Sequence, residues 1–208
     1  MTFDQVLARS PIVAIIRGVT PDEAVDVARA IYDAGVRIIE VPMNSPDPLE
    51  SLKRINAAYG QEMIVGVGTV LNPEVVDRAA DAGARIIVSP NTRSAVIKRT
   101  IERGLTPLPG FATASEAFEA YDAGARYLKL FPASTYGTGH LKALMAVLPK
   151  DATVLAVGGA GPDVMADWWK AGARGFGLGS DLYKAGQSAE VTREKALAAV
   201  EAVRALKA

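Results

Sequence analysis

The chain has 208 residues, and half of them are hydrophobic, which suits one domain with a substantial core. Lysine plus arginine equals aspartate plus glutamate, 23 each, so a general nucleic-acid-binding surface is not expected. Because there is no cysteine and His140 is the single histidine, disulfides, thiolate metal sites and multi-histidine metal sites are excluded.

The N-terminal segment MTFDQVLARSP contains no apolar stretch of signal-peptide length, and residues 1–9 predict a short helix. No window approaches the roughly 18 uninterrupted apolar residues that a membrane-spanning helix needs. We therefore expect a cytoplasmic enzyme that has no membrane partner.

Four segments of the chain resemble one another. They are DAGVRIIEVPMN (33–44), DAGARIIVSPNT (81–92), DAGARYLKLFPA (122–133) and KAGARGFGLGSD (170–181). Each follows an Ala-rich segment with helical periodicity and leads into a short apolar run of strand length. The shared glycines are expected at the helix C′ position, where the left-handed backbone suits a residue without a Cβ atom. These glycines are Gly35, Gly83, Gly124 and Gly172.

Four further strand-like runs alternate with these copies, at residues 11–18, 63–70, 105–110 and 153–159. Each is followed by a helix-start signal, in which a capping residue or proline precedes acidic residues. The eight apolar runs predict a (β/α)8 barrel with a short extra N-terminal helix, and the alternative is an open, doubly wound sheet. We expect residues 1–208 to form a single barrel domain.

Two charged residues interrupt apolar strands. Lys129 lies within Tyr-Leu-Lys-Leu-Phe, and Glu40 ends Ile-Ile-Glu-Val. Burial would keep a lysine neutral and nucleophilic, able to form an imine with a ketone. In a barrel, strand ends form the reactive face, so Glu40, Lys129 and Arg17 are expected to meet there. The structural alternatives are an ion pair for Lys129 and a Glu40–Arg17 salt bridge that only holds the barrel together.

Glycine turns follow the seventh and eighth strands of the predicted barrel. Gly158-Gly159 and Gly179-Ser180 stand where barrels often bind phosphate through backbone N–H groups. Elsewhere, His140 follows the sixth strand in a loop that is either solvated or gates the substrate. Trp168 and Trp169 are expected to lie in a helix and to pack against the barrel or a neighbouring subunit rather than bind a ligand.

The motifs together resemble a known family. IIRG, EVPMNSP, VGVGTVLNP, IVSPN, PGFATASEA, LKLFPAS, AVGG and GLGSDLY run through the whole chain in the order of the 2-keto-3-deoxy-6-phosphogluconate/4-hydroxy-2-oxoglutarate aldolase family. The resemblance implies a class I aldolase that needs no metal and no organic cofactor. It implies that Lys129 forms the Schiff base, that Glu40 moves the protons and that Phe131 packs beside the imine.

One position separates two branches of that family. The phosphogluconate branch usually carries an arginine four residues after the catalytic glutamate, and this chain has Asn44 there. The EVPMNSP form resembles the branch that cleaves 2-dehydro-3-deoxy-6-phosphogalactonate to pyruvate and D-glyceraldehyde 3-phosphate in galactonate breakdown, as a homotrimer. Without that arginine, the contact to the pyruvate carboxylate would come from Thr69, from backbone amides near Pro90 and Lys129, or from Arg17.

Other functions remain open from the residues alone. A phosphate-binding barrel epimerase or isomerase would transfer protons without an imine. A non-catalytic barrel that binds sugar phosphates would do neither. The phosphogluconate aldolase shares the chemistry and differs in the configuration at C4 of its substrate, a phosphorylated 2-keto-3-deoxy sugar acid.

Overall fold

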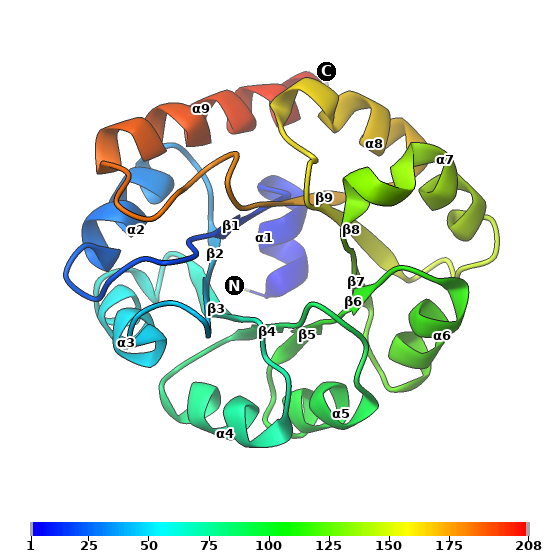
Figure 1. Ribbon diagram of the computed structural model, residues 1–208, viewed down its shortest axis with the longest axis horizontal. Coiled ribbons are helices and arrows are strands. Elements are labelled where there is room, and N and C mark those ends of the chain that lie inside the picture. Colours follow the sequence, from blue (N-terminus) through cyan, green and yellow to red (C-terminus); the bar gives the residue numbers. More distant parts are fainter. Residues whose placement is uncertain (1, 207–208) are drawn as a thin grey trace.

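The computed structural model describes residues 2–206, and in it the parallel strands form a barrel ringed by helices (Figure 1). The strands of the described chain are β1 Ile12–Ile15, β2 Ile38–Pro42, β3 Ile64–Gly68, β4 Ile86–Val88, β5 Thr106–Leu108, β6 Gly110–Phe111, β7 Tyr127–Leu130, β8 Thr153–Val157 and β9 Gly175–Leu178. Their sheet order is β5-β4-β3-β2-β1-β9-β8-β7-β6. The prediction of a barrel is confirmed.

The predicted fifth strand is divided into β5 and β6 at Pro109. Proline has no N–H to donate to a neighbouring strand, so the ladder is interrupted there. β5 pairs with β4, whereas β6 pairs with β7, and the carbonyl of Pro109 accepts the Lys129 N–H at 2.8 Å. This one divided strand therefore joins the two edges of the sheet, which rules out the open, doubly wound alternative.

Helices follow the strands around the outside of the barrel. Within the described chain they are α2 Ala24–Asp33, α3 Pro48–Tyr59, α4 Pro73–Asp81, α5 Ser94–Glu102, α6 Ala114–Asp122, α7 Ala133–Met145, the 3-10 helix η1 Pro162–Val164, α8 Met165–Ala171 and α9 Ala189–Leu206. Helix α1 Phe3–Arg9 precedes the first strand and is not part of this outer ring. None of the described helices is long and apolar enough to cross a membrane.

Capping side chains are found at the starts of two helices that follow the predicted strands. Asn72 caps α4, and Thr113 forms a capping box with Glu116 at the start of α6. The glycines of the four similar segments all have positive φ, between 92° and 116°. At the start of α2 no side chain caps the helix. Instead the Glu23 carboxylate accepts the Thr20 N–H at 3.2 Å, and the helix begins at Ala24.

Two hydrophobic cores lie on the two faces of the sheet. The outer core fills the space between strands and helices, and the inner core fills the barrel. Helix α1 lies across the centre of the ring in Figure 1 and contributes Phe3, Val6 and Leu7 to the inner core. The Phe3 ring meets the Tyr127 ring edge to face, with centroids 4.5 Å apart. The extra N-terminal helix therefore seals the end of the barrel where the strands begin.

Candidate active site

Strand alternation places Glu40 and Lys129 inside the barrel. On β2 the neighbouring Ile39 and Val41 belong to the outer core, whereas Ile38, two residues before Glu40, belongs to the inner one. The same alternation on β7 turns Lys129 inward. The two side chains extend toward one another from strands that are not adjacent in the sheet.

Glu40 is a buried carboxyl group with few polar contacts to offset its loss of hydration. Its side chain is 2% exposed, and Oε2 has no hydrogen-bond partner among the described residues. Burial raises its pKa to about 7, while the nearby charges of Lys129 and Arg17 oppose that rise. Glu40 can therefore gain or lose a proton near neutral pH, as a general acid or base requires.

Gly68 makes the room that the carboxylate occupies. A Cβ atom at position 68 of β3 would overlap the carboxylate of Glu40. The neighbouring register pairs Glu40 with Gly66, so two glycines of β3 face this part of β2. The missing side chains at Gly66 and Gly68 thus leave the space in which the Glu40 carboxyl group lies.

Lys129 is equally buried, at 7% exposure. Burial lowers its pKa, and the positive charge of Arg17 lowers it further, whereas the Glu40 carboxylate raises it. Its Nζ atom lies 4.7 Å from the ring centroid of Phe131. A lysine held in this way is available as a neutral amine, which is the nucleophilic form.

Arg17 forms no ion pair with Glu40 in the described structure. Its Nη1 donates a hydrogen bond to Oδ1 of Asn44 at 3.1 Å, and the N–H of Gly18 donates to Oγ of Ser45 at 2.9 Å. The loop after β2 is thereby attached to the end of β1. The expected alternative of a purely structural Glu40–Arg17 salt bridge is not what the structure contains.

One cavity of about 490 Å³ brings the predicted residues together at the barrel mouth. Arg17, Lys129, Phe131, Gly158, Gly159, Gly179 and Ser180 all line it. Three other predicted site residues, Glu40, Thr69 and Pro90, are not among its lining residues. The cavity therefore connects the lysine to both glycine turns.

The two glycine turns differ in how they are held. Gly158 and Gly159 have φ values of 91° and 71°, and the Gly158 carbonyl accepts the Ser134 N–H at 2.9 Å. After β9, the Gly179 carbonyl accepts the N–H groups of Leu182 and Tyr183 at 2.9 and 2.8 Å. That single helical turn leaves its first N–H groups without helical acceptors, a suitable arrangement for an anion.

Thr69 and Pro90 lie at the ends of β3 and β4. Thr69 has a φ of 58°, a conformation that costs a β-branched residue on the order of 1–3 kcal/mol. Pro90 approaches Gly110 so closely that a Cβ atom at position 110 would overlap its carbonyl group. Strained backbone and close strand contact are thus concentrated at the reactive end of the barrel.

The structure places His140 in a helix rather than in the expected loop. It belongs to α7, its Nε2 lies 2.6 Å from the Ala112 carbonyl oxygen, and its ring stacks on Tyr136 at 5.0 Å. It joins α7 to the loop after β6 and does not line the 490 Å³ cavity. Across the described residues, no group of three or more His, Cys, Asp or Glu side chains could hold a metal ion.

Two residues that line the cavity were not predicted from the sequence. Tyr183 and Lys184 come from the turn after β9, within the motif GLGSDLYKAG. Tyr183 is 2% exposed, and its hydroxyl donates to the Glu23 carboxylate at 2.7 Å. The sequence signal that could have identified Tyr183 and Lys184 is their position shortly after the glycine turn at Gly179.

Comparison with known proteins identifies close relatives. A family model described as KDPG and KHG aldolase matches residues 3–203. The chain is 52% identical over 194 residues to the 2-dehydro-3-deoxy-6-phosphogalactonate aldolase of Escherichia coli (strain K12), covering 93% of this chain and 95% of the relative. It is 33% identical over 144 residues to the KHG/KDPG aldolase of the same strain, covering 69% and 66%.

The similarity extends to three dimensions. A solved structure described as native KDPGal is 51% identical to this chain, with a TM-score of 0.93. The match covers 95% of this chain and 96% of the solved one.

Proposed function

The chain belongs to the KDPG and KHG aldolase family, and from that premise we propose that it cleaves 2-dehydro-3-deoxy-6-phosphogalactonate to pyruvate and D-glyceraldehyde 3-phosphate. It is an aldolase, a carbon–carbon lyase. The observation that carries the assignment of chemistry is the buried Lys129, inside the barrel beside Glu40 and open to a cavity that contains two glycine turns.

The reaction begins at Lys129. As a neutral amine it attacks the C2 ketone of the substrate to give a carbinolamine, and protonation of the carbinolamine hydroxyl group followed by loss of water gives a protonated imine. The positive charge of the imine then accepts the electron pair of the C3–C4 bond as that bond breaks. Burial of Lys129 favours the attack on the ketone, because it keeps the free amine neutral. It also favours the later cleavage, because it keeps bulk water away from the imine.

Glu40 transfers the protons of the reaction. As the carboxylate it takes the proton of the C4 hydroxyl group while C3–C4 breaks, directly or through a water molecule. It then returns a proton to the enamine carbon, and hydrolysis of the imine releases pyruvate. A pKa of about 7 suits both tasks, because each protonation state is well populated at neutral pH.

The substrate carboxylate would lie against Arg17, which takes the place of the arginine missing from position 44. Asn44 supports this assignment, because its side-chain oxygen accepts a hydrogen bond from the guanidinium group. Thr69 and the backbone near Pro90 complete the proposed carboxylate contacts. Phe131 packs beside the lysine Nζ and keeps water from the imine.

The substrate phosphate would lie between the turns at Gly158-Gly159 and Gly179-Ser180. Both turns line the same cavity as Lys129, and the glycines allow backbone N–H groups to approach an anion closely. Phosphate at one end and the imine at the other hold the C3–C4 bond near Glu40.

The proposal includes one catalytic domain of 208 residues that works without a cofactor and assembles as a homotrimer. Several large apolar side chains are exposed on the described surface, which supports self-association. They include Leu71, Ile101, Phe118, Tyr136 and Val147. A cytoplasmic location follows from the phosphorylated substrate, whose charge keeps it from crossing membranes.

The substrate assignment is tested by comparing kcat/KM for the two C4 epimers of the substrate. These are 2-dehydro-3-deoxy-6-phosphogalactonate and 2-dehydro-3-deoxy-6-phosphogluconate. We expect preference for the galactonate epimer, since identity to that branch is 52% against 33%. A preference for the gluconate epimer would assign the chain to the other branch. Failure to cleave either epimer would refute the proposed reaction.

A further inference from the structure

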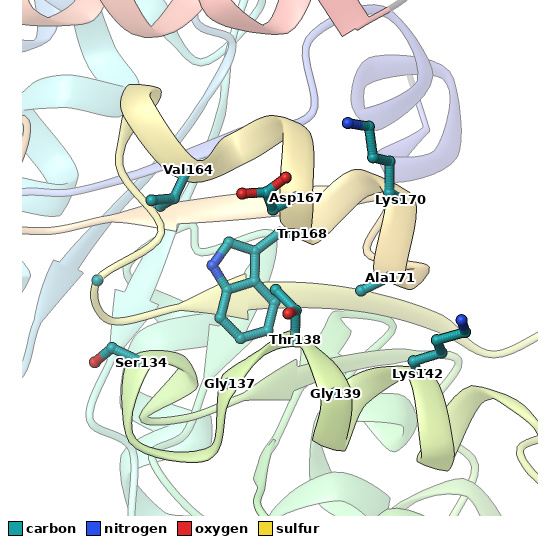
Figure 2. A pocket seen from close by; sticks show the side chains of 11 residues that line it. Ser134, Gly137, Thr138, Gly139, Lys142, Val164, Asp167, Trp168, Lys170 and Ala171 are labelled. Atoms are coloured by element: carbon teal, nitrogen blue, oxygen red, sulfur yellow. The ribbon is translucent and has the colours of Figure 1, made fainter.

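The two glycine turns that line the catalytic cavity are held in different ways. At the first turn, the Gly158 carbonyl accepts the Ser134 N–H at 2.9 Å, and a Cβ atom at Gly159 would overlap the Ser134 side chain. Ser134 stands at the start of α7, where it borders a separate hollow between α7 and α8 whose other wall carries Trp168 (Figure 2). Direct contact with α7 therefore fixes the first turn.

The second turn, after β9, is not fixed by packing at its glycine. A Cβ atom at Gly179 would meet only open space. The Gly179 carbonyl accepts the N–H of Tyr183 at 2.8 Å, so the backbone of the turn is tied to the backbone of Tyr183. The contacts that hold Tyr183 therefore decide where the N–H groups of the turn lie.

Tyr183 is held through its hydroxyl group. The side chain is 2% exposed and lines the cavity, and its hydroxyl donates a hydrogen bond to the Glu23 carboxylate at 2.7 Å. The same carboxylate oxygen accepts the Thr20 N–H at 3.2 Å, so the acceptor is itself fixed at the start of α2. Burial and the Glu23 carboxylate raise the pKa of Tyr183 above its usual range, so the phenol remains protonated and remains a donor.

Further contacts attach the segment that contains Tyr183 to its surroundings. A Cβ atom at Gly18 would approach the Ala185 side chain to 2.9 Å, so this segment packs directly on the loop after β1. On the other side, the Gln187 side chain donates to the Leu182 carbonyl at 2.8 Å and to the Thr192 hydroxyl at 2.9 Å. The segment is thus anchored between α9 and the loop after β1.

We propose that Tyr183 and Glu23 are positioning residues for phosphate recognition. Their hydrogen bond holds the turn at Gly179-Ser180 so that its backbone N–H groups face the phosphate of the substrate. The pair acts through this turn and not on the carbon atoms that react. The inference rests on the proposed function, which places the phosphate between the two glycine turns.

The test compares kcat/KM for the phosphorylated substrate with kcat/KM for its unphosphorylated analogue. Tyr183→Phe keeps the ring and loses the bond to Glu23. KM for the phosphorylated substrate should therefore rise about tenfold, the scale of a lost hydrogen bond to a charged group. Its kcat, and both constants for the analogue, should change little.

A matched control is available on the outside of the barrel. The Tyr121 hydroxyl donates to the Asp151 carboxylate at 2.8 Å, and Tyr121 does not line the catalytic cavity. Tyr121→Phe removes a bond of the same kind and should leave the ratio of the two kcat/KM values at the parent level.

Variants of the acceptor show whether the hydrogen bond itself is responsible. Glu23→Ala should reproduce the loss seen in Tyr183→Phe, and Glu23→Gln, which retains an acceptor oxygen, should recover most of it. Tyr183→Phe combined with Glu23→Ala should be no worse than either single variant, because both remove the same bond.

The outcomes separate this inference from the proposed function. An unchanged ratio in Tyr183→Phe, equal losses for both substrates, or additive losses in the double variant would overturn the inference and leave the phosphate site in place. If the parent enzyme showed no preference for the phosphorylated substrate, the proposed phosphate contact would fail and this inference would fail with it.

Discussion

At the scale of single residues, the site consists of two opposite charges that the barrel interior disfavours. Each of Glu40 and Lys129 is stabilised in its charged form by the other, and burial opposes both. Burial therefore shifts the pKa of each group toward its neutral form, which disfavours a permanent ion pair. This balance distinguishes a reactive pair from a structural ion pair.

Replacement of the carboxyl group should separate imine formation from bond cleavage. Glu40→Gln retains the shape of the side chain but cannot accept the C4 hydroxyl proton. We expect cleavage to slow by about 10² or more, the usual scale for loss of an acid–base group, while imine formation persists. Single-turnover kinetics with the galactonate epimer measure both steps. Near-normal turnover would show that Glu40 is only structural.

The raised pKa of Glu40 also predicts how stability changes with pH. A carboxyl whose pKa rises from 4.5 to about 7 on folding binds its proton more tightly in the folded state. Its favourable contribution is complete below about pH 4.5 and is lost as pH rises to 7. The free energy of unfolding of Glu40→Gln relative to the parent should therefore increase between pH 5 and pH 8, by up to about 3 kcal/mol.

Urea unfolding at the two pH values measures this difference. Glu62→Gln provides the control, because Glu62 is exposed and its replacement should give no comparable change. If the stability difference between Glu40→Gln and the parent were the same at pH 5 and pH 8, Glu40 would not be a carboxyl with a raised pKa.

At the scale of elements, the turns after β8 and β9 carry the proposed phosphate contact. Gly179 offers the cleaner substitution, because a side chain there would meet open space and its φ is not positive. Gly179→Val should fill part of the cavity and raise KM for the phosphorylated substrate by about tenfold or more, by blocking backbone N–H contacts. The unphosphorylated analogue lacks this contact and should lose much less.

The measurement is the ratio of kcat/KM for phosphorylated and unphosphorylated substrates. Gly139→Val is the matched control, since its position in α7 is equally open and lies outside the catalytic cavity. An equal loss for both substrates in Gly179→Val would place the phosphate elsewhere.

The sequence predicted the elements well and their contacts incompletely. Apolar runs and glycine spacing were enough to predict the barrel, and the charged residues within two apolar strands were enough to predict that Lys129 and Glu40 lie inside it. The division of the fifth strand depends on how Pro109 meets two different neighbours, which no local pattern records. The role of Gly68 depends on the register between β2 and β3, and the Arg17–Asn44 bond joins two loops distant in sequence.

At the scale of the whole molecule, the barrel has one reactive end and one sealed end. Helix α1 closes the end of the barrel opposite the 490 Å³ cavity. The helix is attached to β7 by Tyr127, two positions before Lys129, whose hydroxyl donates a hydrogen bond to the Asp4 carboxylate. Stability and chemistry are thus separated along the barrel axis, as is common for this fold. Changes at α1 should affect stability far more than catalysis.

Phe3→Ala tests this separation. Phe3 is 6% exposed and packs against Tyr127, so its truncation should lower the free energy of unfolding by about 3 kcal/mol. Chemical unfolding measures the loss, and KM and kcat at a temperature below the unfolding transition should remain near the parent values. A large change in kcat with little change in stability would contradict the assignment of α1 as a structural plug.

The proposed reaction depends first on an imine between Lys129 and the substrate ketone. Incubation with pyruvate followed by borohydride reduction should add one pyruvate-derived mass to each chain, and peptide mass spectrometry should locate it on Lys129. Lys129→Ala should abolish both the label and cleavage. Lys184 lines the same 490 Å³ cavity as Lys129, so the absence of a label on Lys184 serves as the internal control. A label on Lys184 or on another lysine, or cleavage that persists in Lys129→Ala, would contradict the account.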